Sequence, residues 1–506
     1  DPGDALLPHD TPMTMRSARE RLRDALLELL RHHRSGLFTL AVGVGLVSGA
    51  GAILFRMAID AWTGALTGAQ DYTLSLGAGT GALSALGRWF LLVAPVLSGL
   101  MIGPLMTRLG GTPTGHGVAG VLWSSRRSDG AMAPGPAAAA VVSAALTIGG
   151  GGSVGPEGPI AELGASTASL FGRRLGLPRR AVRLLAAAGT AAGIAAAFNA
   201  PLAGAFFAME VVLVDFTVDA FTFVVLACVS STVLSHHVLG TSLSLSLPTL
   251  NLTGDAQLGW VSVLGVLGGL IGVGFSRARY LSADAAATGA DRLRIPDWAR
   301  PAAGGLLVGG ILLVVPEMYG ESSAILGRAL DGRYTAAALA GLVLAKIIAT
   351  SATLAVGMPG GVFTPSLFIG GTLGACFGTL TTPDRPEAAA VFGVLGMGAV
   401  FSGAARAPLT GVILIIEMTG QYNLLTPLML AVALSTVTGR FLTRSTIYTE
   451  ELRRRGMSIE DPQAPTSVGA RVQERWRRSH HSANRRGGHG GDDGRRLERR
   501  PEGDKG

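Results

Sequence analysis

Long stretches without a charged side chain limit the fold of this chain more than any other feature. Four of those that reach at least eighteen residues are 36–55, 89–106, 258–275 and 347–382. A helix needs about 20 apolar residues to cross the hydrocarbon core of a bilayer. The first three stretches match one crossing each, whereas the fourth, at 36 residues, exceeds one. Because only 15% of the residues are charged and 48% are hydrophobic, the sequence predicts an all-α polytopic integral membrane protein.

Charged residues collect at the two ends of the chain. Residues 1–35 contain six arginines, and the segment from Arg440 onward contains 16 Arg/Lys against 10 Asp/Glu. Basic residues beside membrane spans favour the cytoplasmic side, so we expect both termini in the cytoplasm. The first apolar run is too long for a signal peptide, which predicts that it stays in the mature protein.

The two ends have compositions unlike that of the apolar middle. Leucines recur at helical spacing in residues 18–30, which predicts an amphipathic interfacial helix within a cytoplasmic arm, 1–35. Residues 451–506 are basic, polar and Gly-rich, so we expect a disordered cytoplasmic tail. This composition favours a solvated end over a nucleic-acid site, and it allows contact with anionic lipid headgroups.

The apolar part of the chain contains an internal duplication. Residues 200–210 and 407–417 share the pattern APLxGxxxxxE at a separation of 207 residues. Residues 155–159 and 361–365 share the pattern GxxxP at a separation of 206. Two independent matches at nearly one offset indicate two repeats, at about 36–239 and 258–443.

Each repeat contains a Gly-rich stretch that ends in proline and is followed at once by an apolar helical segment. This pattern predicts that a span breaks within the membrane and that a new helix begins there. The N–H groups at such a helix start are a ready anion site, and two of them meeting at mid-membrane are typical of transporters built from inverted repeats. The alternative is that the glycines only allow helices to pack closely.

These segments resemble those of the CLC family of chloride channels and chloride/proton antiporters. The family motifs GSGIP, GREGP and GxFxP have counterparts in GHGVA (115–119), GPEGP (155–159) and GVFTP (361–365). The resemblance covers residues 36–450, the expected membrane domain. It implies a homodimer whose subunits each have an anion pathway, in a CLC-type fold of about 18 tilted and re-entrant helices in two inverted repeats. The tail is too short and polar for the regulatory CBS domains that some members carry.

The resemblance also implies roles for individual residues. It makes the backbone N–H groups of Val362 and Phe363 donors to a dehydrated anion. It makes Tyr448 the residue whose hydroxyl closes the site from the cytoplasmic side. Considered alone, Tyr448 is more typical of an interfacial aromatic belt.

Glu157 corresponds to the gating glutamate of the family, and its position also has a physical explanation. An ionised carboxylate at the bilayer centre costs about 2.5 to 3.5 kcal/mol, so it needs a compensating environment. A helix N-terminus supplies one. A carboxylate and a chloride would compete for the same N–H groups, and protonation would remove the carboxylate from that competition. The alternative is an ordinary acid at a solvent-facing helix start.

Two positions depart from the first motif. His116 stands where serine is usual, and Ala119 stands where proline is usual. The His116 ring donates N–H to the anion in one interpretation. In the other it points away, and the backbone N–H groups after it, from Gly117 onward, bind the ion. Because histidine titrates near neutral pH, the first interpretation would make the site sensitive to pH.

A further departure from the family pattern concerns the proton route. Family exchangers carry an inner glutamate immediately after the acid of the first APLxG segment, and this chain has Val211 there. The sequence therefore favours passive, channel-like chloride permeation over proton-coupled chloride/H⁺ antiport, which remains the alternative. Glu210 and its repeat mate Glu417 either cap buried partners or polarise water near a proton pathway.

Other functions fit the sequence less well. An intramembrane hydrolase would need a motif such as HExxH, which is missing from this sequence. A cation-coupled solute carrier would present carbonyl ends and carboxylates, whereas both breaks here present helix N-termini. Lys346 adds positive charge near the second break if it faces inward, and otherwise it snorkels or pairs with an acid. Cys228 and Cys376 lie far apart in apolar runs, so neither a disulfide framework nor a metal cluster is indicated. We expect no cofactor.

Overall fold

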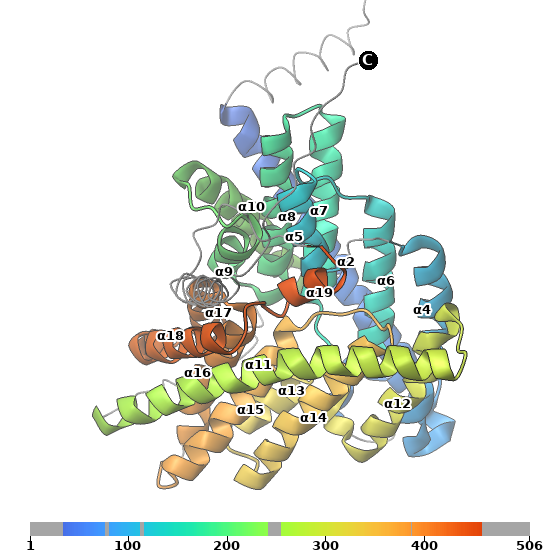
Figure 1. The fold of residues 1–506 in the computed structure, drawn as a ribbon, viewed down its shortest axis with the longest axis vertical. Coiled ribbons are helices and arrows are strands. Elements are labelled where there is room, and N and C mark those ends of the chain that lie inside the picture. Colours follow the sequence, from blue (N-terminus) through green and yellow to red (C-terminus); the bar gives the residue numbers. More distant parts are fainter. Residues whose placement is uncertain (1–33, 76–79, 112–115, 241–254, 386, 458–506) are drawn as a thin grey trace, which may run out of the picture. The chain divides into compact units, whose positions relative to one another are not determined.

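The computed structural model describes residues 34–75, 80–111, 116–240, 255–385 and 387–457 (Figure 1). Within these ranges the chain forms 18 α-helices, labelled α2 to α19, and its β-structure is one isolated bridge. The helices before residue 241 are α2 (Arg34–Thr67), α3 (Tyr72–Ser75), α4 (Phe90–Leu109), α5 (Val118–Arg127), α6 (Pro134–Gly149), α7 (Glu157–Arg174), α8 (Arg179–Phe198), α9 (Pro201–Phe207) and α10 (Val218–Leu239). The helices after residue 254 are α11 (Asp255–Arg292), α12 (Arg300–Val314), α13 (Ser323–Leu330), α14 (Ala336–Ala355), α15 (Phe363–Thr381), α16 (Ala388–Ala405), α17 (Pro408–Thr419), α18 (Leu425–Leu442) and α19 (Thr449–Arg454).

Short helical turns join several of these helices. They are the 3-10 helices η1 (Ser84–Trp89), η3 (Asp297–Ala299), η4 (Pro316–Met318) and η5 (Tyr422–Leu424), and the π-helix η2 (Ala208–Leu213). In the described ranges, nine helices are long and apolar enough to cross a bilayer. The 36-residue charge-free stretch is divided as expected, because α14 ends at Ala355 and α15 begins at Phe363.

The centre of the fold is built from helices that are buried on all sides. Every residue of α16 is buried, which suits a helix that is apolar all round. Glycines bring the neighbouring helices into backbone contact with each other. A Cβ on Gly370 of α15 would lie 2.3 Å from the carbonyl oxygen of Gly396 of α16, and a Cβ on Gly164 of α7 would lie 2.0 Å from that of Gly189 of α8. This packing fixes α7 and α15, the two helices that follow the predicted breaks.

The two predicted repeats, at about 36–239 and 258–443, each correspond to a consecutive series of helices. The first half ends with α10 at Leu239, and the second begins with α11 at Asp255. Figure 1 shows α11 running beside α14, α15 and α16, and α12 packs against α4 of the first half. The predicted tail boundary at residue 450 falls inside α19, which ion pairs between Glu450 and Arg453 and between Glu451 and Arg455 stabilise. The predicted interfacial helix and residues 458–506 of the tail lie outside the described residues.

Candidate functional site

The two Gly-rich breaks meet each other inside the fold. The first lies between α6 and α7, and the second lies between α14 and α15. The N–H of Gly155 donates to the carbonyl oxygen of Gly361 at 3.0 Å, and the N–H of Gly361 donates to that of Gly155 at 2.7 Å. These two hydrogen bonds form the isolated bridge of the structure. The breaks of the two repeats are therefore joined directly, and α7 and α15 begin beside the same point.

The Glu157 carboxylate lies at the start of α15. Its Oε1 accepts the N–H of Phe363 at 2.5 Å and that of Thr364 at 3.3 Å. Its Oε2 accepts the hydroxyl of Thr364 at 3.1 Å. Glu157 is 1% exposed, so its carboxylate is shielded from bulk water. The carboxylate is stabilised instead by donors at a helix N-terminus, where an anion is favoured.

The motif glycines leave room for this carboxylate. A Cβ on Gly361 would lie 2.0 Å from Oε1 of Glu157, and a Cβ on Gly155 would lie 2.1 Å from Oε2. An alanine at either position would displace the carboxylate rather than the backbone, because the carboxylate is the end of a flexible side chain. The glycines of GPEGP and GVFTP thus shape the space that holds Glu157.

Aromatic rings connect the start of α15 to Tyr448. The Phe363 ring lies against Phe198 and Phe401, with ring centroids 4.9 and 4.2 Å apart. The Phe207 ring lies between those of Phe363 and Tyr448. Its centroid is 6.1 Å from that of Phe363 and 6.2 Å from that of Tyr448, against which it packs edge-on. Tyr448 is buried, and it is close enough to Glu157 for the carboxylate to act on it electrostatically.

The predicted site residues Val362, Phe363, Tyr448 and Glu157 therefore gather around one place. Val362 is the residue that precedes α15, and it is buried. The sequence interpretation missed Phe207 and Thr364, which belong to the same cluster. The only sequence signal for Thr364 is its position inside the GVFTP motif.

His116 and Gly117 lie at the start of α5 and contact a second acid of α7. Nδ1 of His116 is 3.1 Å from Oε1 of Glu162, and Nε2 is 2.6 Å from the carbonyl oxygen of Gly110. The N–H of Gly117 donates to Oε2 of Glu162 at 2.6 Å. Both ring nitrogens of His116 are thus engaged by protein groups. Gly115, the first residue of the GHGVA motif, lies outside the described residues.

Glu210 and Glu417 each cap a helix of the opposite repeat. Glu210 accepts the N–H groups of Leu409 and Thr410 at 3.1 and 2.9 Å, at the start of α17. Glu417 accepts the N–H groups of Leu202 and Ala203 at 3.0 and 2.7 Å, at the start of α9. The two acids therefore occupy matching structural positions. Val211, beside Glu210, is buried in the π-helix η2.

Lys346 is fully buried and is held by the chain that precedes α13. Its ammonium donates to the carbonyl oxygens of Gly320 and Glu321 at 3.3 and 3.1 Å, and to the hydroxyl of Ser322 at 3.0 Å. It also lies 5.0 Å from the centre of the Phe368 ring of α15. Lys346 thus faces the interior of the fold near α15.

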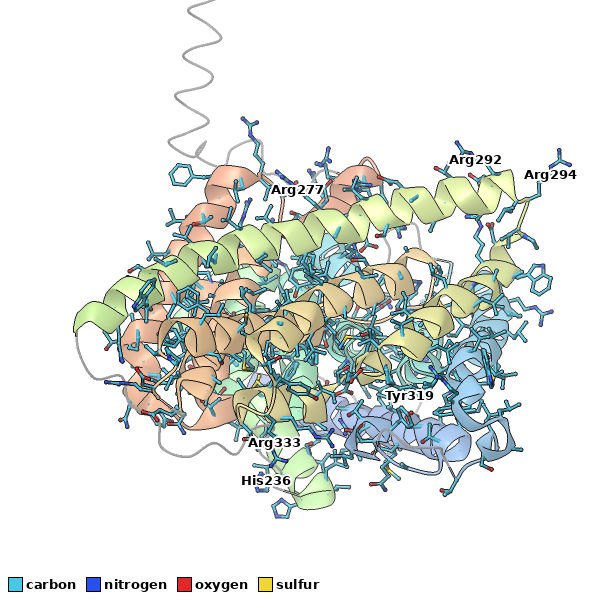
Figure 2. All side chains as sticks on the ribbon, turned by 90° about the horizontal axis from the view of Figure 1, so that it is seen from below. His236, Arg277, Arg292, Arg294, Tyr319 and Arg333 are labelled. Carbon is cyan, nitrogen blue, oxygen red and sulfur yellow. The ribbon has the colours of Figure 1, made fainter. Side chains whose placement is uncertain are left out.

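Two cavities open toward opposite faces of the molecule. One has a volume of about 700 Å³ and is lined by residues that include Pro156, Thr364 and His236. The other has a volume of about 450 Å³ and includes Arg277 in its lining. Figure 2 shows His236 at one edge of the helical layer and Arg277 at the opposite edge. The first cavity therefore reaches the residues that adjoin Glu157 from the face opposite to the second.

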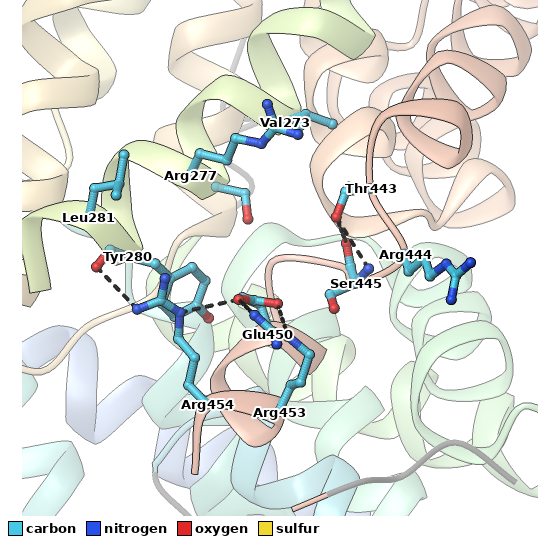
Figure 3. Close-up of a pocket in the computed structure, with 11 residues that line it drawn as sticks. Val273, Arg277, Tyr280, Leu281, Thr443, Arg444, Ser445, Glu450, Arg453 and Arg454 are labelled. Atoms are coloured by element: carbon cyan, nitrogen blue, oxygen red, sulfur yellow. Dashed lines mark hydrogen bonds and ion pairs between the residues drawn. The ribbon is translucent and has the colours of Figure 1, made fainter. Parts of the chain in front are cut away.

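The second cavity is rich in basic side chains and adjoins the segment that carries Tyr448 (Figure 3). The hydroxyl of Tyr280, in its wall, donates to the carbonyl oxygen of Ile447 at 2.6 Å. Hydrogen bonds from Arg453 lower the pKa of Glu450 to about 2, so this acid stays ionised. The charged residues that line the cavity are Arg277, Arg444, Glu450, Arg453 and Arg454. Four cations against one anion leave the cavity positively charged.

Comparisons with known proteins identify the family. The profile of the voltage gated chloride channel family matches residues 96–440, which include all three motifs. A ClcB-like protein of Ralstonia nicotianae is 33% identical over 379 residues, 73% of this chain and 87% of that protein. The H(+)/Cl(−) exchange transporter ClcA of Vibrio cholerae serotype O1 is 31% identical over 336 residues, 63% of this chain and 71% of that protein.

A solved structure is similar over most of its length. It is the crystal structure of a slow cyanobacterial Cl⁻/H⁺ antiporter, with a TM-score of 0.71 and 26% identity over 83% of this chain and 97% of that chain. Its helical architecture matches that built here from two joined repeats. This chain belongs to the CLC family of chloride channels and chloride/proton antiporters, whose members are multi-pass integral membrane proteins.

Proposed function

We propose that this protein transports chloride across a membrane along a pathway that Glu157 gates. The observation that carries the proposal is the Glu157 carboxylate at the N–H groups of Phe363 and Thr364. A chloride bound there would use the same donors. The carboxylate thus keeps the site closed to the anion while it is in place.

Protonation of Glu157 would open the site to the anion. A neutral carboxyl group competes weakly for N–H donors at a helix N-terminus, so a chloride displaces it more easily. Tyr448 and Phe363 then bound the central site on the side of the basic cavity. The basic cavity supplies anions from the face that we assign to the cytoplasm, where we also place both termini.

The transport mode that we propose is passive, because Val211 cannot relay a proton. Proton-coupled exchange is the second candidate. The ClcA relative of Vibrio cholerae is named as an exchange transporter, and the similar cyanobacterial structure is titled an antiporter. A reversal-potential measurement in proteoliposomes under crossed chloride and pH gradients separates the two. A potential set by chloride alone indicates a channel, and one that moves with pH indicates exchange.

Further assignments follow from the family. We propose a homodimer with one anion pathway in each subunit, a location in the cell membrane, and a membrane domain at residues 36–450. The basic tail would lie against anionic lipid headgroups.

The Glu157→Gln variant tests the gate. Glutamine keeps the size of the side chain and removes its titration, so anion flux should persist and lose its dependence on pH. Chloride efflux from proteoliposomes, measured between pH 5 and 8, provides the comparison with the unmodified protein. An unchanged pH dependence in the variant would reject Glu157 as the gate. Absence of chloride flux from the unmodified protein would reject the transport proposal itself.

A further inference from the structure

The basic cavity beside the Tyr448 segment lies where α11 passes from apolar to charged sequence. Residues 258–275 of α11 carry no charge, and Arg277 follows two positions after them. A change from a charge-free run to arginine marks the end of a membrane span, where the phosphates of lipid headgroups lie. Val273 and Arg277 both line the cavity, so its wall crosses this boundary. The cavity therefore adjoins the headgroup layer of the membrane.

Three separate segments contribute arginines to this cavity. Figure 3 shows Arg277 of α11, Arg444 from the segment after α18, and Arg453 and Arg454 of α19 among the residues that line it. A guanidinium is a planar fork of N–H donors, which matches phosphate oxygens in both geometry and charge. Arginines brought together from separate segments are thus typical of a site for a phosphate group.

The acids near these arginines offset only part of their charge. Glu450 is shared between Arg453 and Arg454, at 2.6 and 3.1 Å, and Asp284 binds Arg454 at 2.7 Å. These two acids offset two of the four arginines. Arg277 is exposed and donates to a backbone carbonyl oxygen at 3.1 Å, and that oxygen carries no formal charge to offset the guanidinium. The cavity therefore keeps an excess of positive charge for a ligand.

Exposed apolar side chains accompany the basic ones. Leu281 lines the cavity and is 65% exposed, and Phe441, two residues before the lining residue Thr443, is 86% exposed. A lipid has a charged headgroup and apolar acyl chains, so it can use both kinds of surface, whereas a soluble phosphate compound can use only the arginines. The cavity volume of about 450 Å³ lies within the range of small-ligand sites, about 300 to 1,000 Å³. These features favour a lipid headgroup over a free phosphate compound.

We propose that the basic cavity binds the phosphate group of an anionic membrane lipid. The phosphate oxygens accept N–H groups from Arg277 and the neighbouring arginines, and the acyl chains lie along the apolar surface of α11 and α18. A phosphodiester adds one negative charge, so four arginines against two acids and one phosphate still leave the cavity positive toward chloride. This site goes beyond the proposed transport function and does not depend on it.

The experiment uses the full chain, stripped of lipid in an uncharged detergent at low ionic strength. Short-chain phosphatidylglycerol, phosphatidylcholine of the same chain length, glycerol 3-phosphate and inorganic phosphate are each titrated in while thermal unfolding is followed. A ligand that binds the folded protein raises its melting temperature. We expect this rise with phosphatidylglycerol, which carries a net negative charge, and not with phosphatidylcholine. Glycerol 3-phosphate and inorganic phosphate should act only at much higher concentrations.

A pair of variants locates the site. Arg277→Gln removes one positive charge from the cavity and should weaken phosphatidylglycerol binding about fivefold, the effect of one basic residue on binding to an anionic lipid surface. Arg292→Gln is the matched control, because Arg292 lies on the same helix and the same edge of the molecule but outside the cavity lining (Figure 2). It should bind the lipid as the unmodified protein does.

Three results would overturn the inference. Equal stabilisation by the two lipids would show that the phosphate charge is not recognised, and this comparison needs only the unmodified protein, so it decides even if a variant does not fold. Equal affinities of the two variants would show that the cavity is not the site. Binding of glycerol 3-phosphate as tight as that of phosphatidylglycerol would show that the ligand is a soluble phosphate compound. Chloride flux enters none of these measurements, so the transport proposal stands or fails separately.

Discussion

Thr364 adds a donor to the proposed gate, Glu157, at a position that the family motif leaves variable. Its hydroxyl donates to Oε2 of Glu157 at 3.1 Å, and its N–H donates to Oε1. A backbone donor is available with any residue at this position, whereas the hydroxyl is supplied by this side chain. Thr364 therefore stabilises the ionised form of Glu157, which closes the site in the proposed function, more than an apolar residue would.

Replacing Thr364 tests this contribution. A hydrogen bond to a charged group is worth about 1.5 to 3 kcal/mol, so Thr364→Val should raise chloride affinity at neutral pH roughly tenfold or more. Thr364→Ser keeps the hydroxyl and should bind chloride as the unmodified protein does. Calorimetry on the three proteins gives the comparison. Equal affinities for the valine and serine variants would show that the hydroxyl does not hold the gate.

The helices α9 and α17 are tied together by the acids that each places at the start of the other. Glu210 and Glu417 each accept two backbone N–H groups across the boundary between the repeats. The acids satisfy donors that a helix start leaves unpaired in an apolar environment. This reciprocal capping explains why both copies of the APLxGxxxxxE pattern keep the glutamate.

Removing one of these caps should affect stability rather than transport. Glu417→Ala leaves the N–H groups of Leu202 and Ala203 without their acceptor, at a cost of about 2 kcal/mol. We expect a lower melting temperature in detergent and unchanged chloride flux per folded molecule. Asp215→Ala, which removes an exposed acid after η2, is the control and should melt as the unmodified protein does. Loss of flux at full stability would instead place Glu417 on the transport route.

The two cavities give the protein an unequal charge on its two faces. The cavity beside the Tyr448 segment is lined by four arginines and one acid, Glu450, whereas the opposite cavity is lined by one arginine, Arg56, and three acids, Asp60, Asp71 and Glu321. Positive charge at the mouth of a cavity raises the local concentration of anions. If the basic cavity is an entrance of the proposed pathway, it should make anion entry faster from its own side.

The effect of this positive charge on chloride flux should weaken as the salt concentration rises. Arg444→Gln removes one positive charge from the basic cavity and should slow chloride flux about twofold to threefold at low ionic strength, with little effect near 1 M salt, where the Debye length is about 3 Å. Potassium gluconate sets the ionic strength at constant chloride. Arg292→Gln is the matched control, because Arg292 lies on the same edge of the molecule as Arg277 but outside the cavity (Figure 2). An equal effect of both substitutions would show that the cavity has no special role.

The parts of the fold that could be predicted from the sequence are those that depend on local pattern. Charge-free runs predicted the spans, and the nearly equal offsets of two motifs, 207 and 206 residues, predicted that two breaks meet. The contacts of His116 could not be foreseen, because Glu162 reaches it only once α5 and α7 are packed. The same holds for Glu210, whose partner lies about 200 residues away in α17. In the sequence, Thr364 is an ordinary residue at the start of a helix, because its contact with Glu157 forms only when the two repeats pack together.

The bridge between Gly155 and Gly361 has a bearing on the origin of the protein. In a half-length ancestor, the amide of one break would find no acceptor, and the acid after it would find no helix start to bind. It would need a second copy of itself, related by a two-fold axis, to supply those partners. In the present chain each repeat therefore provides the acceptor that the other repeat's break requires.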